Sequence, residues 1–128
     1  MPGIMLEKTS RTPMVVIDPA EGLFKLEGES YPEDIAGFFT PVRNALEDSF
    51  GEMKNGLKVV IDLVYFNSSS ARVLMEILDQ LDEQASAEFP VNVDWYCDPD
   101  DDITREFAED ISEDLNAVSF TIIDSSSD

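Results

Sequence analysis

Hydrophobic residues alternate with polar residues, or form short β-branched runs, in five parts of the chain. The first two runs, at residues 14–18 and 23–27, flank a turn-forming tetrapeptide, residues 19–22, and this arrangement predicts a β-hairpin. A third run, residues 58–63, is rich in β-branched side chains, which is typical of a strand covered on both faces or at the centre of a sheet. Two further strands are predicted at residues 91–96 and 119–123.

Apolar residues recur at intervals of three and four positions in three other parts of the chain, and this spacing predicts amphipathic helices. The first helix follows Ser30, with Pro32 near the first helical position and Glu33 three residues after the serine, which is the arrangement of a capping box. Pro41 lies inside the apolar pattern of this helix, so we expect a kink or a break there. The three apolar patterns span residues 35–50, 71–85 and 103–115.

These elements follow one another in the order β-β-α-β-α-β-α-β, which predicts an α/β fold. Strands joined by helical crossovers pair in parallel, whereas the opening hairpin adds an antiparallel edge. We therefore expect one mixed sheet of four to five strands packed with helices. The chain of 128 residues has the length of a single domain. We predict this domain at residues 12–123, between a flexible N-terminal arm at residues 1–11 and a disordered tail at residues 124–128.

The amino-acid composition limits the chemistry that the chain can perform. Hydrophobic residues make up 43% of the chain, enough for a core, but the sequence contains no histidine and a single cysteine, Cys97. The absence of histidine removes the Ser-His-Asp triad and most zinc sites. No pair of carboxylates is marked by its spacing as buried or convergent. The residues alone therefore give no support to an enzymatic function, and we expect no cofactor.

The net charge of −20 limits the partners that the chain can bind. A strongly acidic chain repels phosphate backbones and anionic lipids, so we expect neither nucleic-acid binding nor membrane binding. The first residues lack the apolar region of a signal peptide, and no run approaches the roughly 20 apolar residues of a membrane span. These features favour a soluble, cytoplasmic protein.

Most of the acidity lies in the second half of the chain, where residues 76–114 contain 15 acidic residues and one basic residue, Arg105. This stretch is either a solvated face or a docking surface for a basic partner. Acidic residues are most concentrated at residues 98–102, which lack the glycine of an EF-hand loop. Acidic residues at the start of a helix are also explained by capping and by the helix dipole. We therefore predict no metal site, with a small acidic metal-binding protein or enzyme as an alternative.

Three consecutive serines, Ser68, Ser69 and Ser70, follow Asn67 between a predicted strand and the second predicted helix. The N-terminus of a helix presents free backbone N–H groups and the positive end of the helix dipole, and both stabilise a phosphate. Phosphorylation there adds about 1.5 to 2 negative charges to a recognition surface. The alternative interpretation is that one serine caps the helix and that the others are merely small and polar.

The strand residues Asp62 and Leu63, followed by this turn, resemble the phosphorylation turn of STAS domains, the anti-sigma-factor antagonists. Asn67 and Ser70 stand where that turn has an aspartate and a glycine. A closer resemblance, to the SiaC-type regulatory phosphoproteins, a STAS-like bacterial family, covers roughly residues 26–123. It rests on motifs in the same order, namely GESYPE at residues 28–33, DL at 62–63 with YFNSSS at 65–70, and VDWY at 93–96.

The resemblance implies a STAS-like fold and a non-enzymatic switch in cyclic di-GMP signalling. Members of the family are phosphorylated by a Ser/Thr protein kinase and dephosphorylated by a metal-dependent phosphatase, and the unphosphorylated form binds an effector such as a diguanylate cyclase. Ser68 matches the phosphorylated residue, and Ser69 is the fallback site. Asn67 and Ser70 complete the switch turn.

The resemblance also implies partner contacts near the turn, for which Tyr31, Arg72 and Trp95 are the candidates. Tyr31 and Trp95 have an alternative role in core or edge packing. We expect the effector to dock on the bare serine turn and a phosphate to weaken that contact through its charge and bulk. An anti-sigma-factor antagonist in a partner-switching module is the alternative function.

Overall fold

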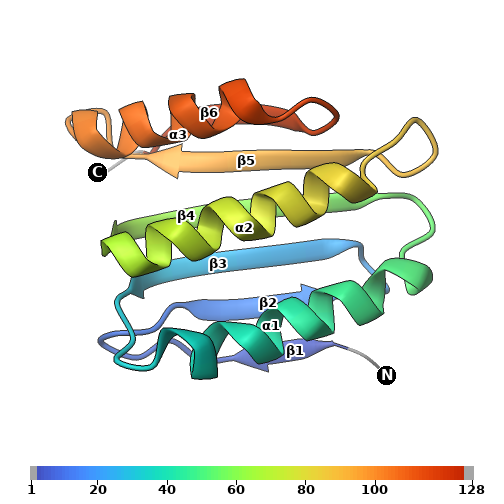
Figure 1. The fold of residues 1–128 in the computed structure, drawn as a ribbon, viewed down its shortest axis with the longest axis horizontal. Coiled ribbons are helices and arrows are strands. Elements are labelled where there is room, and N and C mark those ends of the chain that lie inside the picture. The colour runs from blue at the N-terminus through green and yellow to red at the C-terminus, as the bar shows by residue number, and fades with distance from the viewer. Residues whose placement is uncertain (1–2, 126–128) are drawn as a thin grey trace.

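A computed structural model describes residues 3–125 as a six-stranded sheet with three α-helices and one short 3₁₀ helix. Figure 1 shows the three α-helices side by side on one face of the sheet. In chain order the elements are β1 (Ile4–Leu6), β2 (Met14–Asp18), β3 (Leu23–Ser30), α1 (Ile35–Ser49), η1 (Phe50–Glu52), β4 (Leu57–Phe66), α2 (Ser68–Gln84), β5 (Val91–Cys97), α3 (Asp102–Asp114) and β6 (Ser119–Asp124).

The strands lie in the sheet in the order in which they occur in the sequence. β1, β2 and β3 pair antiparallel, whereas β3, β4, β5 and β6 pair in parallel. Each parallel pair is joined by one α-helix, and each new strand is added on the same side of the growing sheet. Because such crossovers are almost always right-handed, all three helices cover the same face. Within residues 3–125, the opposite face of the sheet carries no helix (Figure 1).

The core lies between the sheet and the helices. Every second residue of the central strands points toward the helices and is buried, as Val59, Ile61 and Leu63 are in β4. The intervening residues lie on the open face and are partly or fully exposed, and on that face Lys58 forms an ion pair with Asp94 at 2.7 Å. The helix side of the core is completed by residues such as Phe39, Val42, Leu46, Leu74, Ile77, Leu78 and Leu81.

Apart from one added strand and the short 3₁₀ helix η1, the elements occur in the predicted order, and the sheet has six strands instead of four to five. The added strand, β1, lies in the segment expected to be a flexible arm. Three residues are too few for a recognisable alternation, but Ile4 pairs with Ile17 and packs against the core. Asp124 belongs to β6, where it pairs with Cys97, and is therefore not part of a disordered tail. Residues 1–2 and 126–128 lie outside the described residues.

The first helix begins later than the capping-box motif predicts. Its N-cap is Asp34, whose carboxylate accepts a hydrogen bond from the backbone N–H of Gly37 at 3.0 Å. Ser30 is instead the last residue of β3 and is fully buried. The prediction that Ser30 caps α1 is therefore wrong, because pairing with β4 extends β3 through this serine.

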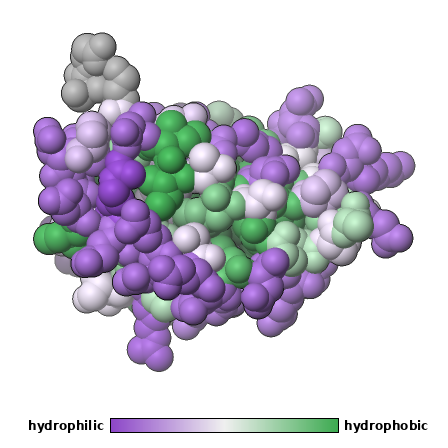
Figure 2. All heavy atoms as spheres, turned by 90° about the horizontal axis from the view of Figure 1, so that it is seen from above, coloured by the Kyte–Doolittle hydropathy of each residue, from purple (hydrophilic) through white to green (hydrophobic). Residues whose placement is uncertain are grey.

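β6 forms one edge of the sheet beside α3, and none of its six residues is fully buried. Phe120 and Ile122 are half-buried and pack against the core. Figure 2 shows this edge of the molecule, where green apolar side chains lie among purple hydrophilic ones. Among residues 3–125, no helix is long and apolar enough to cross a membrane.

Candidate functional site: the serine turn at the start of helix α2

The serine turn joins the carboxyl end of β4 to α2. Asn67 caps the helix, because its side-chain Oδ1 accepts a hydrogen bond from the backbone N–H of Ser70 at 2.9 Å. The backbone carbonyl of Asn67 accepts a hydrogen bond from Ala71, and its N–H donates to the carbonyl of Ser30 at 3.1 Å, which ties the turn to the end of β3. The interpretation that a serine caps this helix is therefore wrong, since asparagine, a preferred capping residue, holds that position.

The three serines occupy the first three positions of α2 but differ in accessibility. Ser70 is fully buried, and its hydroxyl lies 2.7 Å from the hydroxyl of Ser30. Ser68 and Ser69 are exposed. The first turn of α2 contains no acidic side chain that competes for its backbone N–H groups. In this conformation a modifying enzyme can therefore reach Ser68 and Ser69 but not Ser70.

A β-bulge shapes the approach to the turn. β3 and β4 remain in register as far as Gly28 and Leu63, but Glu29 then pairs with Tyr65, so Val64 is an extra residue in β4. Bulges of this kind redirect side chains and are common beside functional sites. Here the bulge ends the alternation of β4, because Val64 and Tyr65 are both exposed, at 69% and 52%.

Beside the turn lies a groove of about 370 Å³, which we call the apolar groove, between the start of α2 and the start of α3. Ser68 lines this groove, and Ser69 does not. Ile103 is 83% exposed, which is unusual for so large an apolar side chain. The apolar residues of the lining are Val64, Tyr65, Phe66, Ala71, Ile103 and Phe107.

Trp95, the single tryptophan of the chain, supports this groove from the core. Its ring is fully buried and packs edge-on against Phe66 and Phe107, with ring centroids 6.1 and 5.9 Å apart. The expectation that Trp95 contacts a partner therefore has no support, because the ring has no exposed surface. Its role is packing beneath two groove-lining aromatic rings, which was the alternative that the sequence left open.

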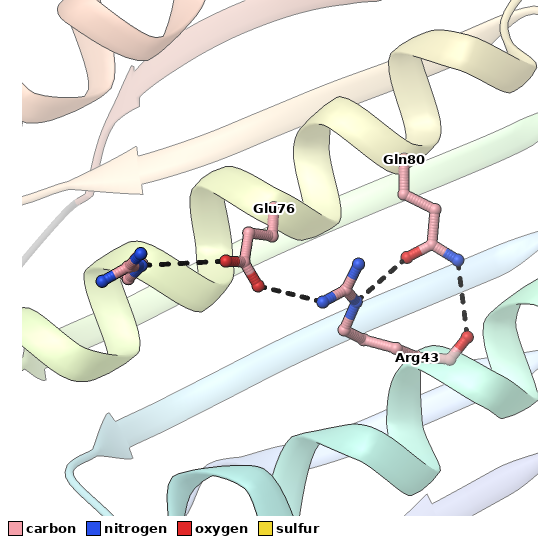
Figure 3. A network of polar contacts seen from close by, with 4 residues as sticks. Arg43, Glu76 and Gln80 are labelled. Atoms are coloured by element: carbon pink, nitrogen blue, oxygen red, sulfur yellow. Dashed lines mark hydrogen bonds and ion pairs between the residues drawn. The ribbon is translucent and has the colours of Figure 1, made fainter.

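The two other predicted contact residues are at the surface. Tyr31 is half-buried and packs edge-on against Tyr65, with ring centroids 5.6 Å apart, so it lies next to the apolar groove. Arg72 is exposed on α2, with its Nε 3.8 Å from the carboxylate of Glu76. Glu76 also pairs with Arg43 of α1 at 3.0 Å, in a polar network that joins the two helices (Figure 3).

The acidic residues before α3 serve the helix itself. Asp101 is the N-cap, and its carboxylate accepts hydrogen bonds from the backbone N–H and the hydroxyl of Thr104, at 3.0 and 2.7 Å. These two hydrogen bonds hold the pKa of Asp101 below its usual value. Within residues 3–125, no three or more histidine, cysteine or acidic side chains are placed to hold a metal ion.

A model of the family described as "SiaC family regulatory phosphoprotein" matches residues 6–125. The chain belongs to the SiaC family. The match includes the serine turn, the apolar groove and all of β2 to β6. A curated relative of the chain, an uncharacterized protein of Pseudomonas aeruginosa (strain UCBPP-PA14), is 31% identical over 116 residues, which cover 91% of this chain and 92% of the relative.

Solved SiaC structures share the fold. The crystal structure of apo-SiaC from Pseudomonas aeruginosa is 30% identical, with a TM-score of 0.85 over 96% of this chain and 99% of that chain. A chain in the crystal structure of the diguanylate cyclase SiaD in complex with its activator SiaC, from the same organism, is also 30% identical. Its TM-score is 0.87 over 95% of this chain and 99% of that chain.

Two features of the site were not predicted from the sequence. The bulge at Val64 leaves no clear signal, because it lies in a strand whose sequence is largely apolar and does not alternate regularly. Ile103 follows the apolar spacing of α3, which predicts a core position, but it lies in the first turn of the helix and is exposed beside the groove. Hydrophobic spacing therefore located the helix and not the surface that its first turn forms.

Proposed function

We propose that this SiaC-family protein is a regulator without enzymatic activity that binds a signalling effector when Ser68 is unmodified and releases it when Ser68 carries a phosphate. The proposed effector is a diguanylate cyclase, and the proposed modifying enzymes are a Ser/Thr protein kinase and a metal-dependent phosphatase, all in the cytoplasm. Support for the effector comes from the relative, since SiaC forms a complex with the diguanylate cyclase SiaD as its activator.

The position of Ser68 carries the proposal. It is exposed, it is the first residue of α2, and it lines the apolar groove. Ser69 is exposed but lies outside the lining of the groove, and Ser70 is buried. Of the three serines, Ser68 is thus the one whose modification changes both the start of the helix and the adjacent apolar surface.

The direction of the switch follows from the cost of burying charge. The helix N-terminus stabilises a phosphate on Ser68, which gives the modified state a defined position. A partner that fills the apolar groove must then remove water from a group with about two negative charges, and that removal is strongly unfavourable because a single nearby cation, Arg72, neutralises only part of this charge. The phosphate therefore weakens effector binding.

Mass spectrometry of the protein isolated from its own cells tests the modification. We expect one phosphate on wild-type protein and on the Ser69→Ala variant, which is the matched control, and none on Ser68→Ala. Phosphate that persists in Ser68→Ala would show that the modified residue is a different one. No phosphate on any form, even with the cognate kinase and ATP supplied, would contradict the proposed switch.

An anti-sigma-factor antagonist with a STAS-like fold is the second candidate. The observation in its favour is the serine-bearing turn between the end of β4 and the start of α2. The two functions differ in their partner. Affinity capture with unmodified protein separates them, because recovery of an anti-sigma kinase, and not of a cyclase, would favour the antagonist.

A further inference from the structure

β4 and β5 separate at the end of the sheet that carries the serine turn. Their pairing ends at Ile61 and Trp95, whereas β4 continues beside β3 as far as Phe66. Next to this last part of β4 lies a second depression, with a volume of about 600 Å³. It shares three lining residues with the apolar groove, among them Val64. The two depressions are therefore adjoining parts of one surface.

Besides Asp101, the N-cap of α3, the second depression is lined by Asp62, Asp98 and Asp100, and we call it the acidic pocket. Among residues 3–125, none of these three carboxylates forms an ion pair. Asp62 is only partly exposed, and its burial, together with the neighbouring Glu27, raises the pKa of its carboxyl group. Lys25, which pairs with Glu27 at 3.4 Å, opposes this rise without reversing it. Within residues 3–125, the pocket thus contains a partly desolvated carboxylate that forms no direct ion pair.

We propose that the apolar groove and the acidic pocket are the two halves of one docking surface, and that its occupant is an effector segment with an apolar cluster followed closely by a lysine or arginine. The inference rests on the proposed effector binding and specifies the chemistry of the segment that binds. The apolar cluster fills the groove, and the cation enters the pocket beside Asp62 and Asp100.

Each half of the surface favours this occupant for a separate reason. The groove exposes Val64, Tyr65 and Ile103, whose apolar area is removed from water when a partner covers it. The pocket offers unpaired carboxylates, and the net charge of −20 draws a basic segment toward the protein and raises the rate of encounter. The acids on the later turns of α3, such as Asp110 and Glu113, are exposed and line neither depression.

The two halves also fit the proposed direction of the switch. Ser68 lines the apolar groove and not the acidic pocket. A phosphate on Ser68 therefore meets the apolar part of the segment or draws its cation away from the pocket. In either case the segment cannot occupy both halves at once.

Site-specific crosslinking locates the occupant. A photo-reactive amino acid replaces Ile103 in the full-length protein, and in a control it replaces Met5, which is 76% exposed on the opposite edge strand. Crosslinked peptides from the producing cells are sequenced by mass spectrometry. We expect position 103, and not position 5, to capture one segment with apolar residues and an adjacent lysine or arginine. Capture of a segment without a nearby basic residue would overturn the proposal.

A double-mutant cycle then tests the acidic pocket. The captured segment is made as a labelled peptide, with its basic residue present or replaced by glutamine, and its affinity is measured for wild type and for Asp62→Asn/Asp100→Asn. We expect each change to weaken binding about tenfold and the two together to cost little more, because both remove the same ion pair. The control is Asp110→Asn/Glu113→Gln, which also removes two negative charges, but from exposed turns of α3 outside the pocket. We expect its affinity for the peptide to stay within about twofold of wild type.

Two results of the cycle would contradict the docking surface. Equal losses of affinity in both double variants would mean that only net charge matters, and additive losses in the cycle would mean that the cation binds elsewhere.

The outcome of the cycle is independent of the proposed switch. If Ser68 carries no phosphate but the cycle shows coupling, the docking surface stands and the switch fails. If Ser68 is phosphorylated but the losses are additive, the switch stands and this inference fails.

Discussion

Three serines that are adjacent in the sequence have three different environments. Ser68 lines the apolar groove, Ser69 is exposed beside it, and Ser70 is buried against Ser30. The difference arises because successive residues of a helix point about 100° apart around its axis. The third position of α2 therefore faces the sheet while the first faces α3. The accessibility of each hydroxyl depends on this geometry and not on the residue type.

The buried pair of serine hydroxyls predicts a coupled loss of stability. Ser70→Ala leaves the hydroxyl of Ser30 without a partner, so we expect it to lower the free energy of unfolding by about 1–3 kcal/mol, and Ser30→Ala to act similarly. The double variant should cost less than the sum, because it leaves no buried hydroxyl unpaired. Urea denaturation measures these values, with the exposed Ser69→Ala as control. Strictly additive losses would show that the two hydroxyls are not coupled.

Asp82, near the end of α2, fastens the loop between α3 and β6. Its carboxylate accepts hydrogen bonds from the backbone N–H groups of Asn116, Ala117 and Val118, at distances from 2.8 to 3.1 Å. Burial acts against the charged carboxylate, but the three donors outweigh it and lower the pKa of Asp82.

This lowered pKa predicts a pH-dependent contribution to stability. Because the pKa is lower in the folded chain than in the unfolded chain, the ionised carboxylate stabilises fully above the unfolded value of about 3.9, and the contribution is lost as the pH falls through the folded value. We expect Asp82→Ala to cost about 1.5–3 kcal/mol at neutral pH. The difference from wild type in urea denaturation should shrink below about pH 4. A difference of the same size at low and neutral pH would contradict this role.

At the scale of the elements, those with long repeating patterns were predictable and those decided by tertiary contacts were not. α2 and α3 lie close to the predicted positions because their apolar spacing repeats over several turns. Ser30 has the neighbours of a capping box, yet its hydroxyl bonds to Ser70, a residue 40 positions away. Pro41 does not end α1, because burial of Phe39 and Val42 against the sheet outweighs one lost backbone hydrogen bond.

The same distinction applies to the candidate site. The serine turn was predictable because a boundary between a strand and a helix leaves a local signal in the sequence. The apolar groove was not, because its second wall comes from α3, which is more than 30 residues further along the chain. Trp95 is the opposite case, since it lies on the same face of its strand as Val91 and Val93, and this alternation favours the buried ring that the structure shows.

The start of α2 predicts how a phosphate on Ser68 behaves before any partner binds. Through the helix dipole we expect it to stabilise the fold by about 0.3–1 kcal/mol. Arg72 lies one turn further on, and side chains of a helix lean toward its N-terminus, so we expect Arg72 to leave Glu76 and pair with the phosphate. In a phosphorus NMR titration, the second pKa of the phosphate should be lower in wild type than in Arg72→Gln. Lys54→Gln, which removes a charge in an exposed loop, is the control, and equal values in wild type and Arg72→Gln would contradict the pairing.

At the scale of the whole molecule, the excess of negative charge acts against the folded state. The net charge is −20, and acidic side chains are exposed along much of α3. Added salt screens repulsion between exposed charges, so we expect the melting temperature to rise between about 0.05 and 0.5 M sodium chloride. Choline chloride should give the same rise, because screening does not depend on which monovalent cation is present. A melting temperature that falls with either salt would contradict this expectation.

The arrangement of the whole fold brings the candidate functional features to one end of the sheet. Parallel strands end together, and in α/β sheets ligands commonly bind beyond the carboxyl ends of the strands. In this protein that end of the sheet carries the serine turn, the bulge at Val64, the apolar groove and the acidic pocket. In the proposed function, a phosphate on one exposed serine therefore acts directly on the docking surface without any change in the sheet.

The most direct measurement compares two forms of the protein, unmodified and phosphorylated on Ser68, in their binding to a diguanylate cyclase purified from the same cells. Ser69→Ala, tested in both forms, controls for the neighbouring hydroxyl. We expect the unmodified form to bind and the phosphorylated form to bind at least about tenfold more weakly, in keeping with the desolvation cost of the phosphate. Equal or tighter binding by the phosphorylated form would contradict the proposed switch.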